Sequence, residues 1–301
     1  MRALLQRLFS SKPQRAPSVP RTASVRTEAP VATNPLWPVT DLPLDGTRPS
    51  TSEQYAITVV RSRVTAEACP SALIGRAPTV IPRLMAMLRQ DHVSAAAMAE
   101  QVTQDATLAA AVLRLSQSPL YRIRRQVNDI ETAIAVLGIQ GLRAAIATVI
   151  MKPIFHERPW GLLGAASTRL WAHGELQATI AGSRAAALGA DQLDGYLAGL
   201  LHNLGWAAAL RSLDLVRAPL NPPFTEGFAQ AMVHARARLF GRLAVAWDIT
   251  PGLTEVGREL LQRGAETEPD TLLQVLREAD AAATRDMFPF NEGAETEPTL
   301  V

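Results

Sequence analysis

A-G-L-L-H-N-L-G, residues 198–205, is the stretch that decides the fold prediction, and it belongs with a second histidine upstream, His173. A histidine on one helix and a histidine followed by an acidic residue on another can bring metal ligands together in a helical pocket. Here Asn203 follows His202, so a neutral carboxamide stands where a carboxylate would attract a divalent cation. We therefore expect a helical domain that keeps the shape of a metal site without its chemistry.

The residues on both sides of this stretch predict one helix after another. Alanine and leucine are abundant while aromatic residues make up only 5% of the 301 residues, and this composition favours helices over sheets. Asp191 is placed to cap the helix that holds His202, which we expect over about 191–204. The same reasoning predicts helices after Asp105 and Asp129 and over about 141–151, 164–188, 225–247 and 270–284.

Small residues share a face of the helix that carries His202. Gly195, Ala198 and Gly199 lie at helical spacing from this histidine. Because they hold no large side chain between two backbones, we expect a neighbouring helix to approach closely here.

The chain divides by composition into three parts. We expect a disordered basic linker rich in Pro, Ser and Arg over 1–55, a helical domain over 56–287 and an acidic disordered tail over 288–301. The basic arm is a possible contact for nucleic acid or a membrane surface, but dispersed charges among prolines favour a solvated tail.

Several classes of protein lack their signals in this sequence. We find no apolar run of about 18 residues that would span a bilayer. We also find no Gly-rich phosphate loop, no G-x-S-x-G and no C-x-x-C. The single cysteine, Cys69, cannot form an internal disulfide, which is typical of a reducing compartment. We therefore expect a cytoplasmic protein with no transmembrane segment.

Seven blocks in order give the sequence a resemblance to a known family. Over about 74–267 it resembles the HDOD domain, the HD-related output domain of bacterial signalling proteins. The matching blocks are P-T-V-I-P-R-L-M at 78–85, 93–108, V-L-R-L-S-Q-S-P-L-Y at 112–121, V-N-D-I-E-T-A-I-A-V-L-G at 127–138, Trp171 with His173, 196–205, and 234–249.

The resemblance implies an all-α fold in two lobes and a regulatory role through contacts with other signalling proteins. The HDOD domain is a relative of the HD phosphohydrolases. The resemblance places the metal-site positions of those enzymes on His173, His202, Asn203 and Asp280. With Asn203 at one of them, we predict no catalytic residue, no metal and no cofactor. The alternative is a divergent HD-type phosphohydrolase acting on a nucleotide or phosphodiester.

The helix over 225–247 has two kinds of side chain. We expect its large apolar residues to be core. Its other side carries Arg236, Arg238 and Arg242, and we predict that this arginine face receives an acidic partner.

Overall fold

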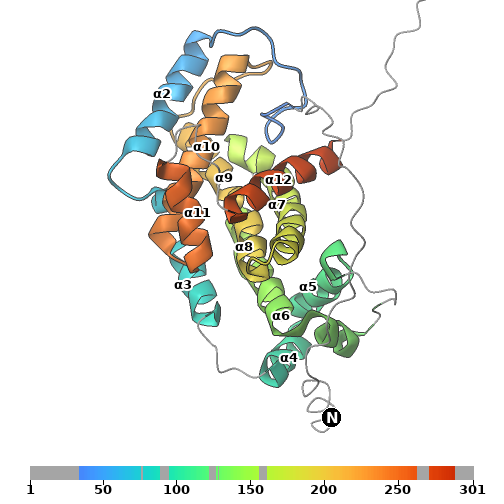
Figure 1. Cartoon of the computed structure of the whole chain (residues 1–301). Coiled ribbons are helices and arrows are strands. Elements are labelled where there is room, and N and C mark those ends of the chain that lie inside the picture. Colours follow the sequence, from blue (N-terminus) through green and yellow to red (C-terminus); the bar gives the residue numbers. More distant parts are fainter. Residues whose placement is uncertain are drawn as a thin grey trace, which may run out of the picture.

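The structure is a computed structural model that describes residues 34–75, 77–88, 95–121, 127, 129–155, 161–262 and 271–288. Its regular elements are all helices, and the described residues contain no strand (Figure 1). They are α2 (Thr51–Thr65), η1 (Pro70–Leu73), α3 (Ala77–Leu88), α4 (Ala95–Gln104), α5 (Ala106–Ser116), η2 (Pro119–Tyr121), α6 (Ile130–Phe155), α7 (Gly161–Ala187), α8 (Gln192–His202), α9 (Leu204–Leu215), α10 (Glu226–Trp247), α11 (Pro251–Gln262) and α12 (Thr271–Met287).

The helices form two lobes, as the resemblance implies. Helices α3 to α5 pack around α6 in one lobe, and α7 to α12 with α2 form the other (Figure 1). Helix α6 joins them because it also packs against α7 and α8. The second lobe therefore contains every helix on which the candidate metal positions were expected.

Helix α6 shows how a glycine sets a helix boundary. Asp129 accepts a hydrogen bond from Thr132 N at 2.7 Å and so caps the first segment. Gly138 then breaks the helical path with φ 59°, a left-handed conformation that glycine adopts at little cost. The first helical segment therefore ends at Gly138.

By length and composition alone α6 is also able to cross a membrane, contrary to the expectation that no stretch qualifies. In the structure, 61% of its most apolar window is buried among the other helices, as in the core helix of a two-lobed bundle.

The second lobe follows the sequence pattern closely, with two additions. Asp191 caps α8 by accepting from Asp194 N at 2.8 Å, and Thr225 caps α10. Helix α9 was not anticipated as a separate element; it begins directly after Asn203. Helix α11 was not anticipated either; it begins at Pro251, because proline is well suited to a first helical turn.

The segment before α2 departs most from expectation. Part of the linker predicted over 1–55 is packed: Leu36 and Trp37 are 1% and 5% exposed. We call residues 34–47 the strap. A polar, proline-rich composition hides such a docked segment because only a few apolar residues anchor it. Residues 1–33 and 289–301, which hold the rest of the expected linker and almost all of the expected tail, lie outside the described residues.

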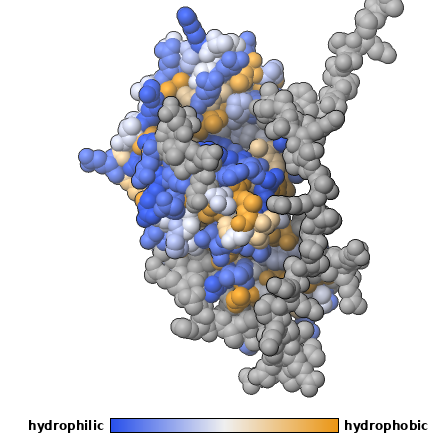
Figure 2. Space-filling model, in the orientation of Figure 1, coloured by the Kyte–Doolittle hydropathy of each residue, from blue (hydrophilic) through white to orange (hydrophobic). Residues whose placement is uncertain are grey.

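Helix α2, also partly inside the predicted linker, is joined to α10 by one carboxylate. Glu53 accepts from Ser50 N at 2.7 Å and from Thr225 N at 2.8 Å, so it serves the first turns of both helices. Hydrophilic side chains cover much of the face seen in Figure 2, with apolar side chains in small groups between them.

Candidate functional site

Four helices bring the expected metal positions together. His173 lies on α7, His202 ends α8, Asn203 separates α8 from α9, and Asp280 lies on α12. Asp280 Oδ1 is 3.5 Å from His202 Nδ1 and 3.8 Å from His173 Nε2. Asn203 Nδ2 is 3.1 Å from His173 Nδ1. The structure therefore brings the four sequence-predicted positions into one cluster.

Glycines allow the helices to approach so closely. A Cβ added to Gly199 would lie 2.7 Å from backbone atoms of Gln177 and Ala178 on α7. One added to Gly205 would lie 2.1 Å from the Arg236 carbonyl oxygen on α10. No side chain fits at such distances, so the small-residue face sets the spacing between helices.

Hydrogen bonds fix the proton position on His173. Asn203 Nδ2 donates to the Leu170 carbonyl oxygen at 2.9 Å, which orients the amide because a carbonyl can only accept. The same Nδ2 then donates to His173 Nδ1, and the ring proton sits on Nε2. His173 Nε2 donates to Thr284 Oγ1 at 3.0 Å, and Thr284 donates onward to the Asp280 carbonyl oxygen. Both ring nitrogens of His173 are therefore engaged.

His202 is enclosed in a similar way. Its Nδ1 is 2.9 Å from Gln177 Nε2, on the turn of α7 that follows His173. The ring of Phe240 meets the His202 ring edge-on at 5.2 Å between centroids. The imidazole is thus held by an amide, by an aromatic ring and by the nearby Asp280 carboxylate.

A guanidinium pairs with the carboxylate of the cluster. Arg236, on α10, donates to Asp280 Oδ2 in a short ion pair, and the two side chains are 12% and 19% exposed. The guanidinium also lies over the Trp206 ring, 5.6 Å from its centroid. The positive charge opposite the only carboxylate of the cluster is therefore supplied by the protein itself.

The protonation states follow from burial and from this pair. Burial lowers the pKa of His173 to about 4 and also lowers the pKa of His202. Burial alone would raise the pKa of Asp280, but the Arg236 guanidinium together with His202 and His173 outweighs burial, and the pKa falls below its ordinary value. At neutral pH the cluster therefore holds two neutral imidazoles and one ionised carboxylate, whose charge the Arg236 guanidinium balances.

This arrangement does not fit a divalent metal. Such an ion needs lone pairs and negative charge, whereas His173 has no free nitrogen and Asp280 is paired with Arg236. Among the described residues, no group of three or more His, Cys, Asp or Glu side chains is arranged to hold one. Four buried polar atoms around the cluster have no hydrogen-bond partner: one oxygen each on Gln177, Asn203 and Asp280, and Nε of Arg236.

The other two arginines of the expected partner surface are hydrogen-bonded to backbone carbonyl oxygens of neighbouring helices and loops. Arg238 donates to the Leu261 carbonyl oxygen at 2.7 Å. Arg242 donates to carbonyl oxygens in the last turn of α2 and just after it, among them Arg63 O at 2.7 Å and Ala68 O at 2.8 Å. The expectation of one outward arginine face does not fit these contacts, because unpaired carbonyls at the ends of helices draw the guanidinium groups.

Sequence reasoning missed the residues that hold the cluster in place. Gln177 follows His173 by four positions, and Thr284 follows Asp280 by four, so each lies on the same helix face as its partner. This i to i+4 spacing can be read from the sequence and could have identified both residues. Trp37, which stacks on His173 at 4.5 Å between ring centroids, had no such signal because it comes from a distant segment.

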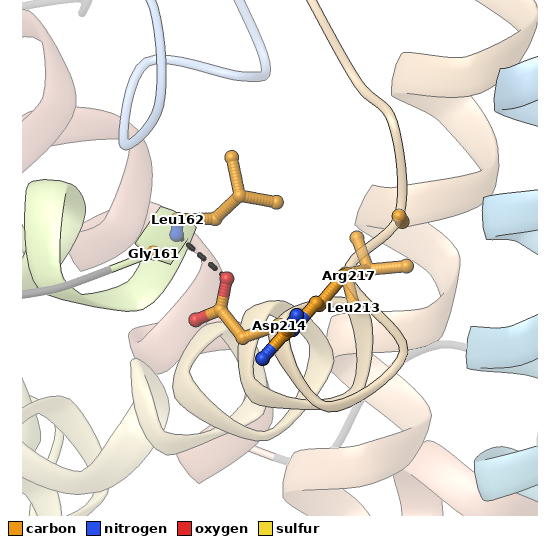
Figure 3. Close-up of a pocket in the computed structure, with 6 residues that line it drawn as sticks. Gly161, Leu162, Leu213, Asp214 and Arg217 are labelled. Carbon is orange, nitrogen blue, oxygen red and sulfur yellow. Dashed lines mark hydrogen bonds between the residues drawn. The ribbon is translucent and has the colours of Figure 1, made fainter.

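A larger pocket lies elsewhere, between the start of α7 and the end of α9. It measures about 580 Å³ and is bordered by Leu162, Leu213, Asp214 and Arg217 (Figure 3). The Asp214 carboxylate accepts from Leu162 N at 2.7 Å and Leu163 N at 3.1 Å, so it already occupies the N-terminus of α7.

Two solved structures have a similar fold. One is an HDOD domain protein of unknown function from Geobacter sulfurreducens, with 24% identity and a TM-score of 0.51, covering 82% of this chain and 83% of that chain. The other, from Shewanella amazonensis SB2B, is described as a candidate metal-dependent phosphohydrolase, with 18% identity and a TM-score of 0.56, covering 79% and 90%. At these identities the likeness concerns the fold alone. No curated protein matches the chain.

The sequence itself matches a family. The model of the HDOD domain matches residues 74–249, which is more than half of the chain and includes all seven resembling blocks. The match includes His173, His202 and Asn203 but ends before Asp280. The chain therefore belongs to the HDOD domain family.

Proposed function

We propose that this protein is a non-catalytic regulator in bacterial signal transduction, acting in the cytoplasm through contacts with other signalling proteins. The observation that carries the proposal is the Arg236–Asp280 pair in the middle of the former metal positions. A resident guanidinium supplies the positive charge permanently, so the cluster is stable without a metal.

The chemistry of phosphoester hydrolysis supports the same proposal. A metal-dependent hydrolase lowers the pKa of a bound water and polarises the phosphoryl oxygen with the metal. In this cluster the candidate bases are neutral imidazoles, and both nitrogens of His173 and Nδ1 of His202 face Asn203, Thr284 and Gln177. A general base must reach a water, and these three nitrogens face protein groups instead.

Metal analysis and a hydrolysis assay on the purified full-length chain test this proposal. We expect substoichiometric divalent metal, and no hydrolysis of bis(p-nitrophenyl) phosphate or a cyclic dinucleotide with Mn²⁺ or Mg²⁺ added. One bound metal per chain together with hydrolysis that His202→Ala abolishes would overturn it.

The alternative is a divergent metal-dependent phosphohydrolase. It is favoured by the name of the Shewanella protein and by the spatial cluster of His173, His202 and Asp280. Under this alternative, Asn203→Asp would strengthen metal binding in the natural background. We expect it to do so only when Arg236→Ala removes the competing guanidinium as well, and calorimetric titration of Mn²⁺ into the single and double variants separates the two cases.

A further inference from the structure

An apolar groove lies beneath the strap. Leu36 and Val39 of the strap pack against Leu162 of α7, Trp206 of α9 and Phe228 of α10, with almost no space left between them. The groove walls thus come from three helices, while the side chains that fill it come from a segment that is not part of the helical bundle (Figure 1). The strap is seated in the groove as a separate peptide would be.

The strap also closes the histidine cluster. The Trp37 ring stacks on His173 at 4.5 Å between centroids and meets Phe288, after α12, at 5.7 Å. Trp37 is the residue through which the strap contacts the candidate site directly. An apolar anchor of this size is typical of the residues that dominate binding at protein interfaces.

A charged contact sets the register of the strap. Nη1 and Nη2 of Arg169 donate to the two oxygens of the Asp41 carboxylate, at 2.8 and 2.6 Å. Nη1 also donates to the Trp37 carbonyl oxygen at 3.2 Å. Arg169 therefore recognises an acidic residue four positions after the tryptophan. Two parallel bonds give such a pair geometric specificity.

A larger pocket adjoins the groove. Leu162 and Leu213 border both the filled groove and the pocket of about 580 Å³ shown in Figure 3. Exposed Arg217 lies at the edge of that pocket. A peptide segment longer than the strap would have room in this pocket. It could contact Arg217 as a second cationic side chain, in addition to Arg169.

We propose that this groove is a peptide-docking site, which the strap occupies in cis, and that a partner protein docks there with a segment of the same chemistry. That segment carries a Leu-Trp pair, an acidic residue four positions after the tryptophan for Arg169, and an acidic extension toward Arg217. The inference rests on the proposed function, since it names the surface through which a regulator would act. The strap is then an autoinhibitory competitor of the partner.

A cleavable strap tests the proposal in the full-length chain. A site-specific protease sequence is inserted between exposed Arg48 and Pro49, and the probe is a fluorescent peptide of residues 34–48. After cleavage we expect the helical domain to keep its circular dichroism and the probe to exchange into the groove. A probe with Trp37→Ala should not enter. Unfolding on cleavage, or no exchange against excess probe, would overturn the proposal.

A second measurement uses the uncut chain. Trp37→Ala weakens the strap in cis, so the wild-type probe should bind this variant at least about tenfold more tightly than it binds the wild-type chain. Leu42→Ala, at an exposed strap position, is the matched control and should leave probe affinity unchanged. Equal affinity for all three chains would contradict competition by the strap. None of these outcomes alters the metal and hydrolysis assays, so a failure here is distinct from a failure of the proposed function.

Discussion

Two Arg–Asp pairs in this protein have the same chemistry and opposite surroundings. Arg236–Asp280 joins α10 to α12 inside the histidine cluster, with side chains 12% and 19% exposed. Arg169–Asp41 joins α7 to the strap at the surface, with side chains 38% and 64% exposed. Removing one partner of a buried pair leaves an uncompensated charge, whereas an exposed charge is solvated by water. We infer that the first pair is a fixed part of the core. The second pair is a latch, by which we mean a surface contact that holds the strap against α7 and contributes little to overall stability.

The largest effect is expected from the buried pair. Arg236→Ala should lower the free energy of unfolding by about 3–5 kcal/mol, because Asp280 stays buried without its counter-charge. Urea denaturation measures this loss. Arg258→Ala, at an exposed pair with Glu255, is the control and should cost less than about 1 kcal/mol. Equal losses for the two variants would remove the distinction between core pair and surface pair.

Replacing the whole buried pair sharpens the same point. Arg236→Met combined with Asp280→Leu should be more stable than Arg236→Ala by at least about 2 kcal/mol, since no lone charge remains in the cluster. A double variant no more stable than the single one would mean that the polar contacts of the cluster, and not its charge balance, hold the helices.

The pH dependence of stability reports on the imidazoles next to that pair. Burial lowers the pKa of His173 to about 4, while the unfolded chain titrates near about 6.5. Between these values only the unfolded state gains the proton, so stability is complete above about pH 6.5 and falls as the pH decreases. From about pH 7.5 to about pH 5 we expect a loss of about 2 kcal/mol or more, to which His202 contributes with the same sign.

His173→Gln is the matched variant for this measurement. It should flatten the decline between about pH 6.5 and about pH 5, as followed by urea denaturation. The lowered pKa of Asp280 affects stability only below about pH 4, where the unfolded carboxyl becomes protonated. An unchanged slope in His173→Gln would show that this histidine is not held neutral in the fold.

The smallest effect is expected from the exposed pair. Arg169→Gln should change the free energy of unfolding by less than about 1 kcal/mol, because water solvates Asp41 when the guanidinium is gone. Its effect should appear instead as faster amide hydrogen exchange confined to the strap, for example at Val39 and Thr40, whose amides bond to Leu36 O. A loss comparable to that of Arg236→Ala would show that the strap is part of the core and not a latch.

Local patterns in the sequence predicted helix ends in both lobes. The caps at Asp105 and Asp191 and the break at Gly138 follow from side-chain and backbone preferences of single residues. The approach of α7 to Gly199 follows from the absence of a side chain there. The strap was not predicted, because its anchors, Leu36 and Trp37, are too few to form a periodic pattern among prolines.

The sequence by itself determined an all-α chain of the HDOD family with a histidine cluster in which Asn203 replaces a carboxylate. Only the tertiary structure decided what balances that cluster. Arg236 lies on the same helix as Arg238 and Arg242, and its charge alone suggests a surface role for all three. Which of them reaches Asp280 depends on how α10 is placed relative to α12, since contacts between helices distant in the sequence leave no periodic signal within either helix.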